Sequence, residues 1–251
     1  MARSQFRVTR VSRLTDSCHV AQAGLMAAQS LLDTELRYLA EDRTSVTTSV
    51  RSVDMDRLSH ALPVRTPRSY AGQRHYSGLF WSATTRGHVP YESRLELDRL
   101  WLADFDPKIV WIAAQPMWLR GRDGNALRRH APDFLLLGAG GSVTVVDVKP
   151  AQFAAQPRVA EVFTWTSSVC AARSWRYEVW TGGDPVHLAN IRALAAARRV
   201  CLFTDPGSAS EPVDARLAAR YRAWTGEVPV NMKVPLSNQA LGRCESEGAS
   251  P

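Results

Sequence analysis

Two short apolar runs joined by a glycine-rich turn constrain the fold of this chain more than any other feature. The first run follows Asp133, the turn reads GAGGS, and the second run ends in Asp147 and Lys149. Runs of this length, bounded by turn residues, are typical of buried β-strands, and the glycines favour a tight connection. The segment His130–Pro150 therefore predicts a hairpin with an acidic residue at its start and an acidic and a basic residue at its end.

The charged residues that end the second run share one side of the predicted strand. Side chains alternate along a strand, so Asp147 and Lys149 lie on one face, roughly 7 Å apart. Val146 and Val148 then point into the core, and the hairpin return can place Asp133 near Asp147. Carboxylate oxygens suit Mg²⁺ or Mn²⁺, and a nearby lysine can stabilise charge on a phosphate. The pattern favours a metal-dependent nuclease, and an ordinary polar pair at a strand end is the alternative.

The helix predicted from the sequence YESRLELDRL offers a third carboxylate. Its acidic residues are Glu92, Glu96 and Asp98, of which Glu96 is the best candidate. The pair Ser93-x-x-Glu96 also matches a capping box, in which the glutamate side chain caps the first turn. The sequence therefore leaves two roles open for Glu96, as a metal ligand and as a helix cap.

Hydrophobic periodicity predicts alternating helices and strands along the middle of the chain. Leu97, Leu100 and Trp101 recur at helical spacing, whereas Trp175–Trp180 alternates as a strand does. This order indicates one α/β domain over residues 71–205, with a central mixed sheet flanked by helices. The predicted elements are helix Ser93–Ala103, strands Ile109–Ala113 and Met117–Leu119, the hairpin Asp133–Lys149, helix Val159–Ala172, strand Trp175–Trp180, helix His187–Arg198 and strand Val200–Phe203.

The two ends of the chain are predicted to be less regular. Residues 1–70 form an extension in which Asp16–Glu41 has the periodicity of an amphipathic helix. Thr44–Ser69 is rich in Ser, Thr, Arg and Pro, a composition typical of a linker. Residues 206–251 form a shortened C-terminal region with one predicted helix, Asp214–Trp224, and an irregular tail.

The chain is basic, with a formal net charge of +7 and a sequence pI of about 9.6, which favours polyanionic partners. Only three of its 31 basic residues are lysines. Arginine forms bidentate contacts with phosphate, although a GC-rich coding sequence produces the same bias. A cluster of arginines before the first run is predicted to contact the DNA backbone, or else to be solvated loop charge. Its members are Arg120, Arg122, Arg128 and Arg129.

Cysteine spacing and hydropathy argue against several other classes. The four cysteines are scattered without a CxxC pair, which argues against a zinc site and gives no support for a disulfide framework. No apolar run approaches the ~18 residues of a membrane span, and the N-terminus lacks the apolar core of a signal peptide. No nucleophile-elbow motif supports a Ser/His/Asp hydrolase. We therefore expect a cytosolic protein, associated with the nucleoid if the chain is bacterial.

Three segments of the middle region carry a resemblance to a known family. They read HVPYESRLELDRLWLADFDPKIVWIAAQP, then RHAPDFLLL through VTVVDVKP, then WRYEVWTG with HLANIRALAAARR, in that order within residues 71–205. These segments resemble the TnsA-like endonuclease subunit of heteromeric transposases, in the PD-(D/E)xK, restriction-endonuclease-like superfamily. The resemblance implies a restriction-endonuclease-like fold and DNA cleavage with Mg²⁺, for which Mn²⁺ can substitute.

The resemblance also implies a role for each residue of the predicted site. The family's catalytic glutamate falls on Glu96 within SRLELD, and the aspartate of its D-F strand falls on Asp133. The position two before its lysine, acidic or amide in the family, falls on Asp147, and the lysine falls on Lys149. The three carboxylates would ligate the metal, and the lysine would stabilise charge. Gln115, in the family-like A-Q-P, would either help to position the metal site or form a buried turn.

Family membership would imply a division of labour between subunits. TnsA-like subunits hydrolyse the strand at the 5′ ends of the transposon, a DDE-type transposase cuts and joins the 3′ ends, and an AAA+ ATPase regulates target use. One departure concerns the C-terminus, because only about 30 residues separate Phe203 from the family-like segment Val234–Ser237. That is too few for the usual winged-helix-like region, so the partner-binding module is predicted to be shortened. The alternatives are a stand-alone nuclease of the same superfamily and a catalytically silent DNA-binding or assembly subunit.

Overall fold

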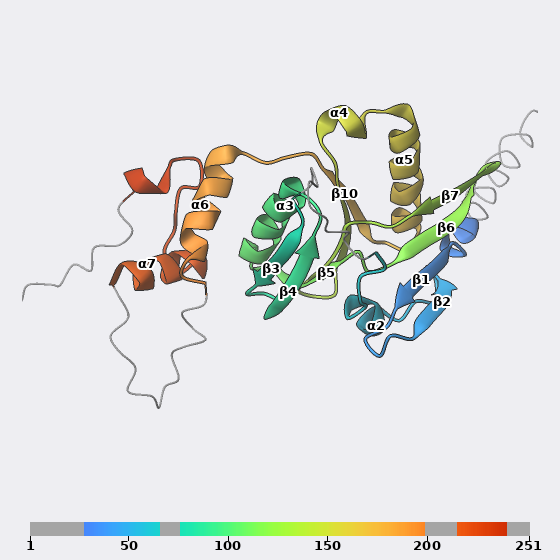
Figure 1. The fold of residues 1–251 in the computed structure, drawn as a ribbon, viewed down its shortest axis with the longest axis horizontal. Helices are drawn as coiled ribbons and strands as arrows, with labels where there is room; N and C mark the ends of the chain where they lie inside the picture. The colour runs from blue at the N-terminus through green and yellow to red at the C-terminus, as the bar shows by residue number, and fades with distance from the viewer. Residues whose placement is uncertain (1–27, 66–75, 199–214, 240–251) are drawn as a thin grey trace, which may run out of the picture.

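A four-stranded mixed sheet forms the centre of the molecule, which a computed structural model describes over residues 28–65, 76–198 and 215–239 (Figure 1). Its strands lie in the order β10-β9-β8-β5, and β10 runs parallel to β9 while the other neighbours are antiparallel. The predicted hairpin is β8 and β9, and the expected mixed α/β class is confirmed. The strands are β5 (Ile109–Ala114), β8 (Phe134–Gly138), β9 (Val143–Val148) and β10 (Arg176–Trp180).

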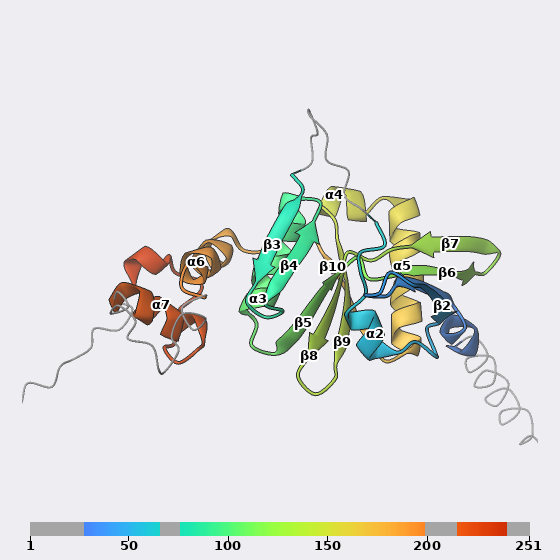
Figure 2. The ribbon, with the colours of Figure 1, turned by 60° about the horizontal axis from the view of Figure 1, so that its bottom comes forward.

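Helices cover both faces of this central sheet (Figures 1 and 2). Leu135 of β8 belongs to the same apolar cluster as Trp165 of the helix on one face. Its neighbours Phe134 and Leu136 belong to the cluster of Leu100, from the helix on the other face. Because side chains alternate along a strand, a run of apolar residues buries both of its faces in this way. The two helices are α3 (Arg94–Phe105) and α5 (Pro157–Ala172).

The start signal predicted for the first helix, Ser93, coincides with the observed start. Ser93 caps α3, and its hydroxyl oxygen accepts a hydrogen bond from the backbone N–H of Glu96 at 3.1 Å. Asp184 caps α6 (Pro185–Ala195) in the same manner, accepting from the N–H of His187 at 2.8 Å. The predicted helices and strands between residues 93 and 195 are confirmed, with small shifts at their ends.

A second, antiparallel sheet has the order β2-β1-β6-β7. Its inward face contributes Leu36, Tyr38 and Leu119 to the apolar cluster under α5. The sequence predicted only a short strand at Met117–Leu119, and did not predict the hairpin that β6 forms with β7. The strands are β1 (Glu35–Leu39), β2 (Ser45–Ser49), β6 (Trp118–Asp123) and β7 (Ala126–His130).

Two predictions for the N-terminal region were therefore wrong. The helix predicted over Asp16–Glu41 is helical only to Leu32 within the described residues, and Glu35–Leu39 of it forms β1 instead. The linker predicted over Thr44–Ser69 contains β2 and α2 (Met55–Ser59). Leucines at helical spacing favoured the helix, yet Leu36, Tyr38 and Ala40 are buried at alternate positions, as on a strand. Since β1 pairs with β6, this region shares a sheet with the middle of the chain. Residues 16–27 of the predicted helix lie outside the described residues.

The remaining elements lie around α3. A hairpin of β3 (Gly78–Ser82) and β4 (Gly87–Tyr91) packs against it, and α6 packs between α3 and α7 (Ala215–Trp224). The predicted helix Asp214–Trp224 corresponds to α7, whereas the predicted strand Val200–Phe203 lies outside the described residues. Within the described ranges, no helix is both long and apolar enough to cross a membrane.

The C-terminal segment Val234–Ser237 docks on α6 through Asn190, which is only 2% exposed. The Asn190 amide donates to the carbonyl oxygens of Met232 and Val234 at 3.2 and 2.8 Å. Its own oxygen accepts from the N–H of Leu236 at 2.8 Å. One buried side chain thus anchors this segment, which ends in a 3₁₀ turn, Leu236–Asn238.

Candidate active site

Glu96 lies in the first turn of α3 and is only 7% exposed. One carboxylate oxygen accepts a hydrogen bond from the N–H of Glu92 at 2.8 Å, and the other accepts from the hydroxyl of Ser93 at 2.9 Å. This reciprocal arrangement is the predicted capping box. Burial raises the pKa of the Glu96 carboxyl. The side chain therefore serves as a cap while its charge lies at the edge of the sheet where β8 begins.

Asp133 lies immediately before β8 and joins the edge of the sheet to the N-terminal region. One carboxylate oxygen accepts from the N–H of Val148 at 2.7 Å, and the other lies 3.4 Å from a guanidinium nitrogen of Arg65. Burial first, and then the charges of Asp147 and Glu96, raise the pKa of Asp133 to about 8. The three carboxyls predicted for the site therefore interact electrostatically.

Asp147, at the end of β9, is buried and is held by two donors. His130 Nε2 lies 2.8 Å from both carboxylate oxygens, and the hydroxyl of Tyr177 donates to one of them. Because a carboxylate can only accept, Nε2 carries the proton in this contact. Burial, followed by the charge of Asp147, raises the pKa of Tyr177, so that its hydroxyl remains a donor. Both oxygens of Asp147 are thus occupied by protein donors.

Neither donor to Asp147 was assigned a role from the sequence. His130 lies at the end of β7, which was not predicted, and it contacts the ring of Phe163 edge-on. Tyr177 had a detectable signal, because Trp175–Trp180 alternates and places Tyr177 on the same face as buried Trp175. A tyrosine on a buried face requires a hydrogen-bond partner for its hydroxyl. Asp147, at the end of the neighbouring strand β9, was a candidate acceptor for this hydroxyl.

Lys149 follows the last residue of β9 and is exposed. Its backbone N–H donates to the carbonyl oxygen of Trp180 at 3.0 Å, which continues the pairing of β9 with β10. Across residues 28–65, 76–198 and 215–239, its ammonium group makes no hydrogen bond or ion pair. The lysine is therefore held by its backbone beside the carboxylates, with its charge available to a ligand.

Gln115 and Arg65 also form hydrogen bonds with Asp133. Gln115 adopts a positive φ of 44° and is 4% exposed. Its N–H donates to the carbonyl oxygen of Asp133 at 2.7 Å, while its own carbonyl oxygen accepts from the N–H of Val64 at 2.9 Å. This geometry gives Gln115 the role of a buried turn residue, although its side-chain oxygen has no partner in the described part of the chain. No sequence signal identified Arg65, which fell within the predicted linker.

The four arginines predicted to contact DNA lie on one hairpin but divide between its two faces. Arg120 pairs with Arg129 across β6 and β7, and both are exposed, as is Arg122. Arg128 points the other way, where its guanidinium lies 3.0 Å from a carboxylate oxygen of Asp123 and 2.9 Å from one of Glu161, on α5. The charge of Arg128 is therefore engaged within the protein.

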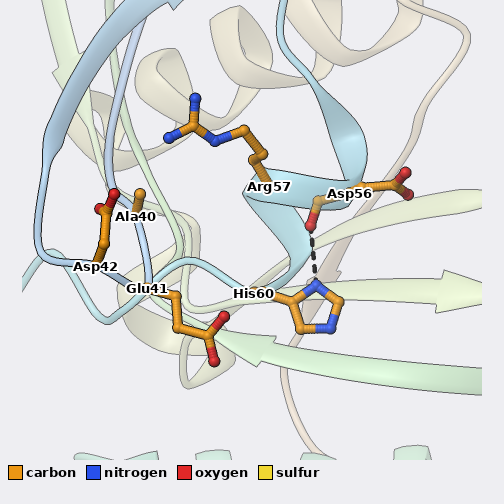
Figure 3. Close-up of a pocket in the computed structure, with 6 residues that line it drawn as sticks. All are labelled: Ala40, Glu41, Asp42, Asp56, Arg57 and His60. Carbon is orange, nitrogen blue, oxygen red and sulfur yellow. Dashed lines mark hydrogen bonds between the residues drawn. The ribbon is translucent and has the colours of Figure 1, made fainter.

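A surface hollow lies apart from this site (Figure 3). It has a volume of about 590 Å³ and lies between the turn after β1 and helix α2. His60 is fixed there by a contact of 2.9 Å between its Nδ1 and the carbonyl oxygen of Asp56. None of the predicted site residues belongs to the lining, which consists of Ala40, Glu41, Asp42, Asp56, Arg57 and His60.

The arrangement around Asp133 provides oxygen ligands and positive charge side by side. Within the described residues, no group of three acidic, histidine or cysteine side chains is already arranged as a metal cage. The carboxylates of Asp133 and Glu96 are nevertheless close enough to interact, and both have raised pKa values. Such a concentration of negative charge attracts a cation. Asp133 and Glu96 are therefore the residues that could hold a divalent cation here.

No protein-family model and no curated protein matches the chain.

Proposed function

We propose that this protein is a Mg²⁺-dependent DNA endonuclease whose active site is centred on Asp133. The observation that carries the proposal is the buried carboxyl of Asp133, which lies between the N–H of Val148 at 2.7 Å and the guanidinium of Arg65 at 3.4 Å and on which the charges of Asp147 and Glu96 act. Isolated carboxylates at the end of a strand do not repel one another in this way. Strongly shifted pKa values arise preferentially at functional sites.

The carboxylates fit a hard divalent ion. Glu96 and Asp133 would hold Mg²⁺, because their repulsion is relieved by a cation and their oxygens are the ligands that Mg²⁺ prefers. Asp147 would join them only by releasing its contact with His130 or Tyr177. The ion would stabilise negative charge on the phosphate during hydrolysis.

The two nearby cations would act on the phosphate in different ways. Lys149 carries an exposed ammonium at the end of β9, where it would stabilise the negative charge that develops on the phosphate. Arg65 reaches the carboxylate of Asp133 at 3.4 Å and is 36% exposed. It would hold Asp133 in place and offset the negative charge of its carboxylate until a metal ion takes over that role.

The resemblance further supports a place in a heteromeric transposase. In this proposal the protein hydrolyses the strand at the 5′ ends of a transposon, in company with a DDE-type transposase and an AAA+ ATPase. The C-terminal segment that Asn190 anchors on α6 provides the remaining surface through which such partners would dock. A gene for a DDE-type transposase beside the gene for this chain would separate this proposal from a stand-alone nuclease.

The test is Mg²⁺-dependent nicking of DNA that contains the transposon ends, with the partner subunits present. We expect Lys149→Ala to lower the nicking rate by roughly 10³-fold, the scale of losing one charge-stabilising group. Lys108→Ala is the matched control, because Lys108 is also exposed but lies at the opposite end of the central sheet, before β5. A wild-type protein that nicks no faster than Lys149→Ala would refute the proposal.

A catalytically silent DNA-binding or assembly subunit is the second candidate. The occupation of both Asp147 oxygens by His130 and Tyr177 favours it, since that carboxylate is not free to bind a metal. Titration with Mg²⁺ separates the two candidates without requiring cleavage. A rise in melting temperature that Glu96→Gln abolishes supports the nuclease, whereas a temperature that Mg²⁺ leaves unchanged supports the silent subunit.

A further inference from the structure

The second sheet exposes one face that is rich in arginine. Residues paired directly across antiparallel strands lie on the same face. The register pairs Arg37 of β1 with Trp118 of β6, and it pairs Arg120 with Arg129 of β7. Along the same face, Arg122 pairs with Leu127. We call this the outer face, defined by Arg37, Trp118, Arg120, Arg122, Leu127 and Arg129.

The outer face is accessible and carries little opposing charge. All four of its arginines are exposed, and Leu127 is 61% exposed. The acidic residue of this face within β1 and β6 is Glu35, whose carboxylate lies 4.0 Å from the guanidinium of Arg120. An ion pair at that distance between half-exposed side chains is weak. The face therefore presents a net positive surface over three neighbouring strands.

We propose that the outer face binds the phosphate backbone of double-stranded DNA beside the bond that is cut. This inference deepens the proposed function and rests on it for the position of the cut. A duplex carries one negative charge per ~1.7 Å of its axis, so an array of arginines matches it in charge without reading its sequence. Apolar Leu127 and half-buried Trp118 lie among the arginines, where they would contact sugars.

The outer face is continuous with the candidate active site. The guanidinium of Arg129 lies 4.0 Å from the centre of the Trp118 ring, and that of Arg65 lies 5.9 Å from it. Arg65 also contacts Asp133, and β7 runs directly into the segment that leads to Asp133. Arg65 therefore links Trp118 of the outer face directly to Asp133 of the candidate site.

The outer face differs from the arginine cluster predicted from the sequence, because it includes Arg37. Arg37 lies on β1, far from the other arginines along the chain, and it joins them only because β1 pairs with β6. Arg128, by contrast, belongs to the predicted cluster but is turned toward α5 and paired with Glu161. Pairing across the sheet, not proximity in sequence, thus decides which arginines share the surface.

The experiment measures binding of a short, fluorescein-labelled DNA duplex of random sequence by anisotropy, in EDTA, between about 50 and 200 mM salt. The variant combines Arg37→Gln, Arg120→Gln and Arg122→Gln. We expect the slope of log affinity against log salt to fall by about 3, and the affinity to fall by roughly two orders of magnitude. If the triple variant does not fold, Arg120→Gln and Arg122→Gln are each tested alone, with an expected fall in slope of about 1.

The control removes the same number of charges elsewhere. It combines Arg57→Gln, Arg86→Gln and Arg176→Gln, which are exposed on α2, in the turn after β3 and on β10. We expect the control to keep the slope of the wild type. An equal loss in the two triple variants would show a general effect of net charge and would overturn the inference. Tighter binding of an RNA duplex of the same sequence would overturn the choice of DNA.

Failure of the nuclease proposal gives a different result. Lys149→Ala should lower the salt slope by no more than about 1, against about 3 for the outer-face variant, because Lys149 lies outside the outer face. The outer-face variant should raise KM for nicking without lowering kcat, whereas Lys149→Ala should lower kcat. If the wild type does not cut but the slope still falls only in the outer-face variant, the docking surface stands and the nuclease proposal fails.

Discussion

The two sides of the candidate site treat their buried carboxyls in opposite ways. On the α5 side, Asp147 receives two donors, His130 and Tyr177, and both of its oxygens are satisfied. On the other side, Asp133 and Glu96 have raised pKa values, and burial, then the charge of Asp147 and then that of Glu96 act on Asp133. One side is therefore complete in its hydrogen bonds, while the other favours protonation or the arrival of a cation.

This difference supports the proposal that a ligand binds on the side of Asp133. A buried carboxylate with complete hydrogen bonding contributes to the fold, whereas carboxylates that repel one another reduce its stability. Residues that destabilise the fold while gathering like charge are typical of functional sites. The comparison predicts that the same substitution, aspartate to asparagine, has opposite effects on the two sides.

The largest expected effect is the pH dependence that Asp133 gives to stability. Because its pKa is raised to about 8, the folded state holds a proton that the unfolded state releases above a pH of about 4. This contribution to stability is fully present below pH ~4 and is lost as the pH rises to about 8. Asp133→Asn should therefore be more stable than the wild type at pH ~9, by on the order of 6 kcal/mol, and nearly equal at pH ~4.

Urea unfolding of the wild type and of Asp133→Asn across this pH range is the measurement. Added Mg²⁺ should reduce the difference at alkaline pH, because a bound cation stabilises the ionised carboxylate. Parallel stability curves for the two proteins would contradict the raised pKa and remove the contrast between the two sides.

On the α5 side, Asp147→Asn should destabilise the protein by about 3 kcal/mol. The amide would direct N–H groups at Tyr177 or His130, which are themselves donors, and would leave a buried donor without an acceptor. Urea unfolding near neutral pH measures the loss. A cost below about 1 kcal/mol, within the range of a single neutral hydrogen bond, would mean that the network around Asp147 contributes little.

Local sequence was sufficient to predict the elements that carry the site. The apolar runs identified β8 and β9, and Ser93-x-x-Glu96 identified both the start of α3 and its cap. These signals are local because alternation and capping act within a few residues. The positions of Asp133, Asp147 and Lys149 at the ends of strands followed from them.

The partners of these residues could not be predicted, because they come from distant parts of the chain. His130 lies 17 residues from Asp147, Tyr177 lies 30 residues from it, and Arg65 lies 68 residues from Asp133. Each contact depends on which strands become neighbours, which no local pattern specifies. β1 was also mistaken for a helix, because leucines at helical spacing masked the alternation of Leu36 and Tyr38.

Removing one donor tests how the α5 side is organised. Tyr177→Phe should lower the free energy of unfolding by about 1.5 kcal/mol, the scale of a hydrogen bond to a charged group. His130 would still hold both oxygens of Asp147, so the loss should be smaller than that of Asp147→Asn. Thermal and urea unfolding measure this difference. A loss as large as that of Asp147→Asn would show that Tyr177 alone holds the carboxylate.

The smallest expected effect concerns Arg128, the member of the arginine cluster that faces α5. Its partners Asp123 and Glu161 are 41% and 55% exposed in their side chains, so Arg128→Gln should cost only about 0.5 kcal/mol of stability. The same variant should leave the salt slope of DNA binding unchanged, because Arg128 is turned away from the outer face. Urea unfolding and duplex anisotropy on one preparation measure both quantities. A fall in slope equal to that of Arg122→Gln would show that both faces of the hairpin reach the DNA, and the separation of a binding face from a structural face would be wrong.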